Sequence, residues 1–218
     1  MKHLRKFATE ADVRMIVQPN VVLIGDEGRV LYNVETIKGA FIQHINGGLY
    51  STEEWTVGGF ASDEANGVAV ISDNAKFVIG KTSLGKMSWS SDTSNAVEGV
   101  MLTNVMADAK TDYAGRTNTA LIAVDDTSGA ALACANYTFP NGLKGYLPAI
   151  GELVEANKFK ADINTALTLI GGEGMTGTIW SSTQYEAAKA WCHGWGFNGS
   201  PISYSKTAIT DVRAFSAL

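Results

Sequence analysis

Few side chains in this sequence could act as a nucleophile or a general base, because the chain has three histidines and two cysteines. A cysteine protease would have to pair Cys134 or Cys192 with His44 or His193. Cys192 and His193 are adjacent, and neighbouring side chains on a strand point to opposite faces, so the two cannot form that pair on a strand. We therefore expect no catalytic site, and two reduced, mostly buried thiols.

Motifs for phosphate, dinucleotide or metal binding are also incomplete. The run Gly171-Gly172-Glu173-Gly174 lacks the lysine and hydroxyl of a P-loop and follows a helical pattern, so it predicts a turn. Asp125-Asp126, or Asp108 with Asp112, could supply oxygen ligands to calcium, but neither has the spacing of a calcium loop. Asp126 is better placed to cap a helix. We expect no metal and no cofactor.

The richest recognition chemistry lies in residues 180–211, where large rings alternate with small polar residues. Rings give rigid contact area and small polar groups give hydrogen bonds at low entropic cost, a combination typical of binding surfaces. We expect Trp180 and Trp191 in the core. His193, Phe197 and Tyr204 are the candidates for exposure. The rings of this region are Trp180, Tyr185, Trp191, Trp195, Phe197 and Tyr204.

Charge and hydropathy exclude several classes of partner. The net charge is −5 without a cluster of Lys and Arg, which argues against binding to nucleic acid or to an anionic membrane. Since no apolar run approaches about 20 residues, no membrane insertion is expected. The basic start Met-Lys-His-Leu-Arg-Lys-Phe is not followed by the apolar stretch of a signal peptide.

The first half of the chain reads as short strands and turns. Val21–Ile24 and Arg29–Tyr32 flank a loop of turn-forming residues, which predicts a β-hairpin. A lone hairpin is unstable, so residues 1–34 are expected to pack on the next domain or to mediate assembly. Between about 35 and 105 we expect further strands, including 67–71 and 76–79, joined by a turn at Ser72-Asp73-Asn74.

Helices are expected only after this strand-rich part. The first follows the caps at Asp126-Thr127-Ser128, and the second starts at Pro148, which suits the first helical position. A third, at about 159–170, places Ile163, Ala166, Leu167 and Ile170 on one face and stops at Gly171-Gly172. Beyond Thr178 we expect short strands with long polar connections. The fold class is therefore α+β.

Several motifs together resemble the C-type-lectin-like domains of phage tail-fibre and bacterial surface proteins. They also resemble the variable proteins of diversity-generating retroelements, such as those of Bacteroides and their phages. The resemblance covers about residues 100–218, with Thr111-Asp112-Tyr113-Ala114-Gly115 similar to what precedes the domain core. The motifs are Gly145-Tyr146-Leu147-Pro148, Trp180-Ser181-Ser182-Thr183, Ala190-Trp191 and Val212-Arg213-Ala214-Phe215.

The resemblance implies two to three helices packed on twisted antiparallel strands, paired N- and C-terminal strands, and no catalysis. It implies a lectin-like domain over 35–218, after the 1–34 hairpin, with variable binding loops in 180–211. Trp195 and Lys206 would belong to the scaffold. The ligand-binding positions eligible under retroelement variation are His193, Gly194, Phe197, Ser200, Pro201, Ser203, Tyr204, Ser205, Ala208 and Thr210.

We therefore expect a non-enzymatic protein that binds a protein or glycan receptor, on a phage virion or a bacterial cell surface, and that could form a homo-oligomer. The expectation requires His193, Phe197, Ser203 and Tyr204 to lie on one exposed face. One alternative is a structural component that uses the domain for assembly, with a large apolar patch on its N-terminal half. Another is a catalyst like the formylglycine-generating enzymes, with a cysteine or copper–thiolate site in a deep pocket.

Overall fold

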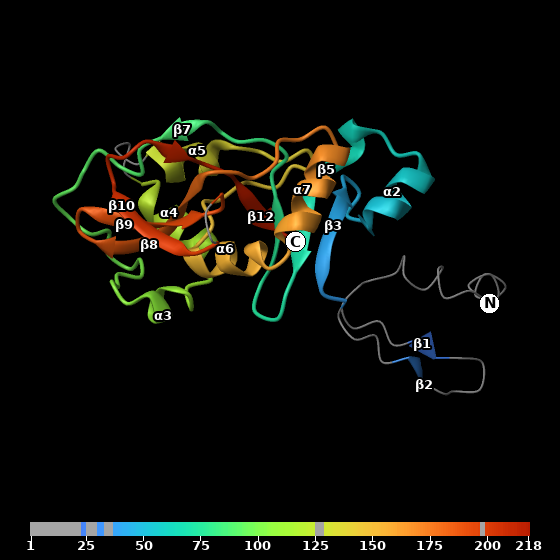
Figure 1. Ribbon diagram of the computed structural model, residues 1–218, viewed down its shortest axis with the longest axis horizontal. Coiled ribbons are helices and arrows are strands. Elements are labelled where there is room, and N and C mark those ends of the chain that lie inside the picture. The colour runs from blue at the N-terminus through green and yellow to red at the C-terminus, as the bar shows by residue number, and fades with distance from the viewer. Residues whose placement is uncertain (1–22, 25–29, 33–36, 125–128, 197–198) are drawn as a thin grey trace.

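The structure is a computed structural model that describes residues 23–24, 30–32, 37–124, 129–196 and 199–218. Figure 1 shows the strands β8 to β10 toward one end and β3 and β5 toward the other, with α6 between them and α7 beside β3 and β5. Since helices and mainly antiparallel strands occupy separate stretches of the chain, the predicted α+β class is confirmed.

One five-stranded sheet is entirely antiparallel. Its strands, in spatial order, are β12 (Phe215–Ala217), β6 (Lys76–Ile79), β5 (Ala65–Ile71), β3 (Gly39–His44) and β4 (Leu49–Tyr50). The predicted strands at 67–71 and 76–79, with their turn at 72–74, are confirmed. The C-terminal strand joins this sheet but pairs with β6 and not with the first strand, β3. The expected direct pairing of the first and last strands is therefore wrong.

A second five-stranded sheet carries the predicted binding region. Its strands, in spatial order, are β10 (Pro201–Ser205), β9 (Lys189–Gly194), β8 (Thr178–Glu186), β11 (Thr210–Asp211) and β7 (Lys86–Met87). All neighbours are antiparallel except β8 and β11. β10 occupies one edge of this sheet.

The predicted N-terminal hairpin is confirmed at its described residues. β1 (Leu23–Ile24) and β2 (Val30–Tyr32) pair antiparallel, with Leu23 opposite Tyr32. They form a two-stranded sheet of their own. The assignment of residues 1–34 to assembly stays a prediction.

Helices begin earlier in the chain than predicted. They are α2 (Thr52–Gly58), α3 (Met106–Ala109), α4 (Gly115–Ile122), α5 (Gly129–Asn136), α6 (Ile150–Asn157) and α7 (Lys160–Leu169), with a 3₁₀ turn at Ser62–Glu64. α2 buries only Trp55, so it shows no apolar periodicity, but its Ser51 and Glu54 form a reciprocal capping box. In the described ranges every helix is too short or too polar to cross a bilayer.

The later helices follow the sequence more closely. α5 and α7 lie where expected, with Ile163, Ala166, Leu167 and Ile170 buried. Gly171 has a φ of 68° and ends α7, as predicted. The predicted start of α6 at Pro148 is wrong, because the Pro148 C=O accepts the Ser182 N–H (2.8 Å) and the helix begins at Ile150. The cap predicted at Asp126 lies outside the described residues.

Two apolar cores share the sheet of β5 and β6. Val68 and Phe77 belong to the first core, with residues of α6 and α7, with Trp191 of the other sheet and with Trp195, which follows β9. The second core contains residues of α5 together with Ala69, Val78, Trp89, Trp180 and Cys192. Because both faces of β5 are covered, every one of its residues is buried.

A buried polar network joins β8 to the starts of α4 and α6. The Asp112 carboxylate accepts hydrogen bonds from the Thr183 hydroxyl (2.7 Å), the Asn118 amide (2.9 Å) and the Ala114 N–H (2.9 Å). The Thr183 hydroxyl in turn accepts the Ile150 N–H (3.0 Å). Since a buried carboxylate is tolerated only when it is hydrogen-bonded, these segments must meet in this one arrangement.

Glu152 extends the network at the start of α6. Its carboxylate accepts the Ala149 N–H (2.7 Å) and the Tyr146 hydroxyl (2.9 Å). A methyl group on Gly115 would lie 2.2 Å from Glu152 Oε2, so only glycine fits there. Burial raises the pKa of Glu152 to about 7, against the lowering effect of the two hydrogen bonds, and the Asp112 charge adds to the rise.

We predict that Glu152→Gln removes a pH dependence of stability. The folded pKa lies above the unfolded value, so wild-type stability is retained below about pH 4.5 and declines as the pH rises through about 7. Gln cannot ionise, so at pH 8 the variant should be more stable by about 1–3 kcal/mol. Urea unfolding at pH 5 and pH 8 measures the difference, and an identical pH profile for the two proteins would contradict the prediction.

Candidate functional site

The predicted contact residues are not equally accessible. Ser200, Tyr204 and Ser205 are exposed, while Ser203 and Ala208 are partly buried. His193, Gly194, Pro201 and Thr210 are buried, and Phe197 lies outside the described residues. The accessible members therefore gather on β10 and the turns at its two ends.

The prediction that His193 is an exposed contact is wrong, because its side chain is 0% exposed. It lies on β9, which has β8 and β10 on its two sides, so the strand is internal to the sheet. The imidazole packs edge-on against Trp195, with ring centroids 5.7 Å apart. Among the described residues, neither ring nitrogen makes a hydrogen bond of good geometry, and neither does the Trp195 Nε1. This buried ring therefore belongs to the interior and not to a binding face.

Gly194 and Thr210 are likewise structural. The Gly194 N–H donates to the Ser200 C=O (3.0 Å), and the Thr210 hydroxyl donates to the Thr178 C=O (2.7 Å). Both interactions hold the sheet together at the ends of β9 and β11. Both residues are buried, so the structure gives their assignment as ligand contacts no support, and that assignment stays a prediction.

Residues 180–211 are mostly strand, which corrects the expectation of long variable loops. β8 and β9 are joined by the two residues 187–188. Both strands are buried almost throughout, because α6 packs near them in the first core and Trp180 faces the second. The small polar residues of β8, such as Ser181 and Ser182, are therefore buried in a strand.

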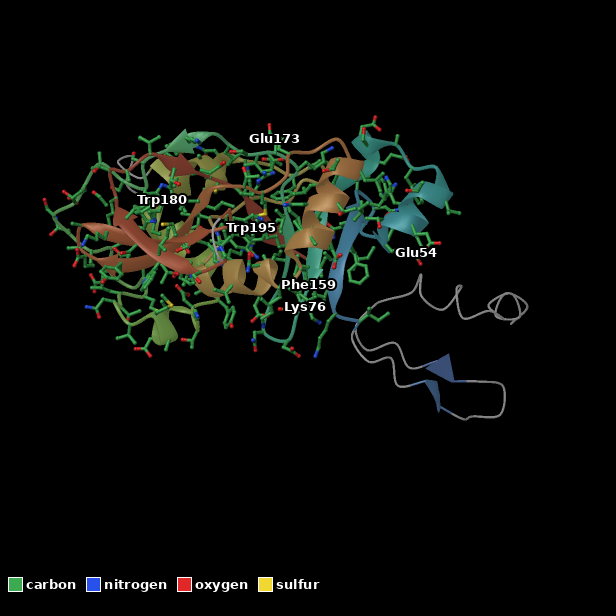
Figure 2. All side chains as sticks on the ribbon, in the orientation of Figure 1. Glu54, Lys76, Phe159, Glu173, Trp180 and Trp195 are labelled. Atoms are coloured by element: carbon green, nitrogen blue, oxygen red, sulfur yellow. The ribbon has the colours of Figure 1, made fainter. Side chains whose placement is uncertain are left out.

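The scaffold residues of this region were predicted correctly. Trp180, Trp191 and Trp195 are buried, and Figure 2 shows Trp180 and Trp195 inside the protein. Lys206 is 1% exposed, and its ammonium group donates to the Asn95 C=O (3.0 Å) and the Gln184 Oε1 (3.1 Å).

The buried Lys206 ammonium fixes the turn that follows β10. It lies 4.6 Å from the centre of the Trp89 ring, a cation–π contact. Burial lowers the pKa of Lys206, and the Asp92 carboxylate opposes this effect. The Lys206 ammonium therefore anchors the end of β10 through three contacts, with Asn95, Gln184 and Trp89.

Among the described residues, one backbone edge of β10 has no partner strand. The Gly194 N–H donates to the Ser200 C=O, so Ser200 and Gly194 form a hydrogen-bonded pair. Along the observed register the next hydrogen-bonded residues of β10 are therefore the even-numbered ones, Ile202 and Tyr204. Because bonded residues alternate in an antiparallel pair, Ser203 and Ser205 direct their backbone N–H and C=O groups away from β9. The Ser205 C=O accepts the Ala208 N–H (2.9 Å) within the next turn.

The side chains of β10 divide between two faces, so the prediction that Ser203 and Tyr204 share one face is wrong. Tyr204 lies over Trp180, with ring centroids 6.4 Å apart and planes at 85°. Ser203 is paired with Trp191 and points to the opposite face. Sequence reasoning missed Ile209, which is 66% exposed in the connection between β10 and β11.

The groups that could act as nucleophile or base are buried. Burial raises the pKa of the Cys192 thiol to about 12 and raises that of Cys134 further. Cys134 lies in α5, as predicted, and both thiols are free and buried. Within the described ranges no three His, Cys, Asp or Glu side chains are grouped to hold a metal ion.

Comparison with known proteins identifies a structural relative but no family. No family model matches the sequence, and no curated protein matches it. A solved fimbrial protein from Bacteroides ovatus ATCC 8483 is similar, with a TM-score of 0.60 and 15% identity over 84% of this chain and 49% of that chain. This chain thus spans about half the length of the fimbrial protein. At this identity the similarity shows a common fold alone.

We predict that His193 destabilises the protein in acid. Burial lowers its pKa to about 4; the Gly199 backbone opposes this effect, and Lys160 and Lys110 add to it. The folded pKa lies below the unfolded value of about 6.5, so stability is retained above that pH and is lost as the pH falls toward 4.

His193→Leu should flatten this acid limb, because the variant has no imidazole to protonate. At pH 4.5 the loss of stability relative to pH 8 should be smaller in the variant by about 1–3 kcal/mol. Comparing each protein with itself at the two pH values removes the effect of the changed packing. Parallel pH profiles for wild type and variant would contradict the role given to His193.

Proposed function

We propose that this protein is a non-enzymatic binding module of a bacterial surface structure, and that it binds a protein or glycan receptor through β10 and its flanking turns. The observation that supports this proposal best is the arrangement of Ser200, Tyr204 and Ser205. These exposed side chains occupy an edge strand whose ends are fixed by buried contacts. A receptor would meet a surface that is already ordered, so binding costs little conformational entropy.

The scaffold is proposed to be C-type-lectin-like and similar to the variable proteins of diversity-generating retroelements. The motifs that suggested this resemblance meet in the interior. Asp112, Thr183, Pro148 and Arg213 all make buried hydrogen bonds between segments. The guanidinium of Arg213, for example, donates to the Gly80 C=O (3.1 Å) and the Glu173 C=O (3.0 Å).

A surface location is favoured over a phage virion because the structural neighbour is a fimbrial protein. A binding role is favoured over catalysis because the candidate nucleophiles and the candidate base on β9 are buried. Tyr204 offers an aromatic ring for stacking on a sugar or for packing on a peptide.

The proposal is tested by binding to intact Bacteroides cells, measured by flow cytometry with labelled protein. A Ser200→Ala/Tyr204→Ala variant should lose affinity by about tenfold or more, since truncating an interface tyrosine often costs at least 1.4 kcal/mol. Val57→Ala is the matched control, because Val57 is 83% exposed on α2, outside the second sheet. Equal binding by wild type, double variant and control would reject β10 as the receptor site.

A further inference from the structure

β10 is the longest uncovered sheet edge in the part of the chain that the structure describes. The opposite edge strand, β7, and the edge strand β4 have two residues each. The edge of β12 is covered, because Phe215 exchanges two backbone hydrogen bonds with Tyr146 (2.7 and 2.9 Å). β10 has five residues, and within the described ranges it pairs with β9 alone.

This edge also lacks the usual protection against strand pairing. Exposed edges are normally blocked by charged side chains, bulges or prolines. The segment Ile202-Ser203-Tyr204-Ser205 contains no charge, and its ladder with β9 runs without a bulge. Pro201 protects only the first position. An unprotected edge of this kind accepts another strand through main-chain hydrogen bonds.

The outward backbone groups of β10 are complementary to those of a second β10. If two strands meet antiparallel with Tyr204 opposite Tyr204, Ser203 of each lies opposite Ser205 of the other. Each such pair exchanges two N–H to C=O bonds, giving four bonds in all. The Ser205 C=O can accept a second hydrogen bond besides that from Ala208, since a carbonyl oxygen has two lone pairs.

Resting on the proposed function for the site, we propose that the partner of β10 is a second copy of this chain, paired antiparallel across a two-fold axis beside Tyr204. Exposure favours this register, because it pairs Ser203, Tyr204 and Ser205 with the same residues of the second copy. A register centred on Ser203 would instead pair Ser205 with Pro201, which is buried. The two Tyr204 rings, each 40% exposed, become cross-strand neighbours. The two five-stranded sheets then form one continuous sheet across the dimer.

Sedimentation velocity over a concentration series tests self-association of the full chain. The mass should rise toward twice the 23.1 kDa of the monomer. Ser203→Pro removes the outward N–H and leaves the ladder with β9 intact, so it should weaken association about tenfold or more. Ser203→Ala keeps that N–H and should associate like wild type. A wild type that stays monomeric, or equal association by the two variants when both are folded, overturns the proposal.

Cross-linking tests the register. Residues opposite each other in a non-hydrogen-bonded pair have Cα atoms about 4.5 Å apart, within the range of a disulfide. Tyr204→Cys should therefore form a covalent dimer on mild oxidation, and the native thiols do not compete because both are buried. Ser203→Cys should cross-link much more slowly, because Ser203 lies opposite Ser205 of the second copy and only diagonally across from the second copy's Ser203. Faster cross-linking by Ser203→Cys overturns this register.

The cell-binding assay separates this proposal from the proposed function. A monomeric wild type that binds cells, with binding lost in the Ser200→Ala/Tyr204→Ala variant, overturns the dimer and leaves the receptor site. A dimer that is broken by Ser203→Pro, with no binding to cells, supports the pairing and rejects the receptor site. Dimerisation that follows the expected Ser203 and Tyr204 pattern, together with cell binding, supports both.

Discussion

The hydrogen bonds of the buried Asp112 carboxylate are the constraint on which the rest of this structure depends. Its oxygens join the start of α4 to β8, and through the Thr183 hydroxyl to the first turn of α6. Losing one of its three donors would leave the buried carboxylate under-satisfied, which typically costs more than the hydrogen bond itself contributes. The orientation of β8, and hence the position of β9 and β10 beside it, follows from this one group.

The sequence predicted best those features that depend on local pattern. Helical spacing was sufficient to predict α7, whose buried face carries Ile163, Ala166, Leu167 and Ile170. Gly171 was sufficient to predict where this helix ends. Tryptophan has a large apolar ring system, so residue type alone predicted that Trp180 and Trp191 lie in the core. In α2 the pattern was present only as the capping pair Ser51 and Glu54, without a periodic apolar face, so the helix was missed.

The site was predicted less well because exposure depends on the order of strands in the sheet. A polar residue such as His193 has the same local pattern on an internal strand as on an edge strand, and only the pairing of β9 on both sides buries it. For the same reason the small polar residues of β8 resembled a loop. Tyr204 and Ser205 were identified correctly as exposed because their strand lies at the edge.

Glu152 and His193 have opposite effects on the electrostatic part of the folding free energy. Between about pH 4.5 and 6.5 the folded protein holds a proton at Glu152 that the unfolded chain releases, and lacks one at His193 that the unfolded chain takes up. On unfolding in this range Glu152 releases a proton and His193 takes one up, so the net number of protons exchanged at these two sites is close to zero. Glu152 and His193 therefore make opposing contributions to the pH dependence of stability in this range.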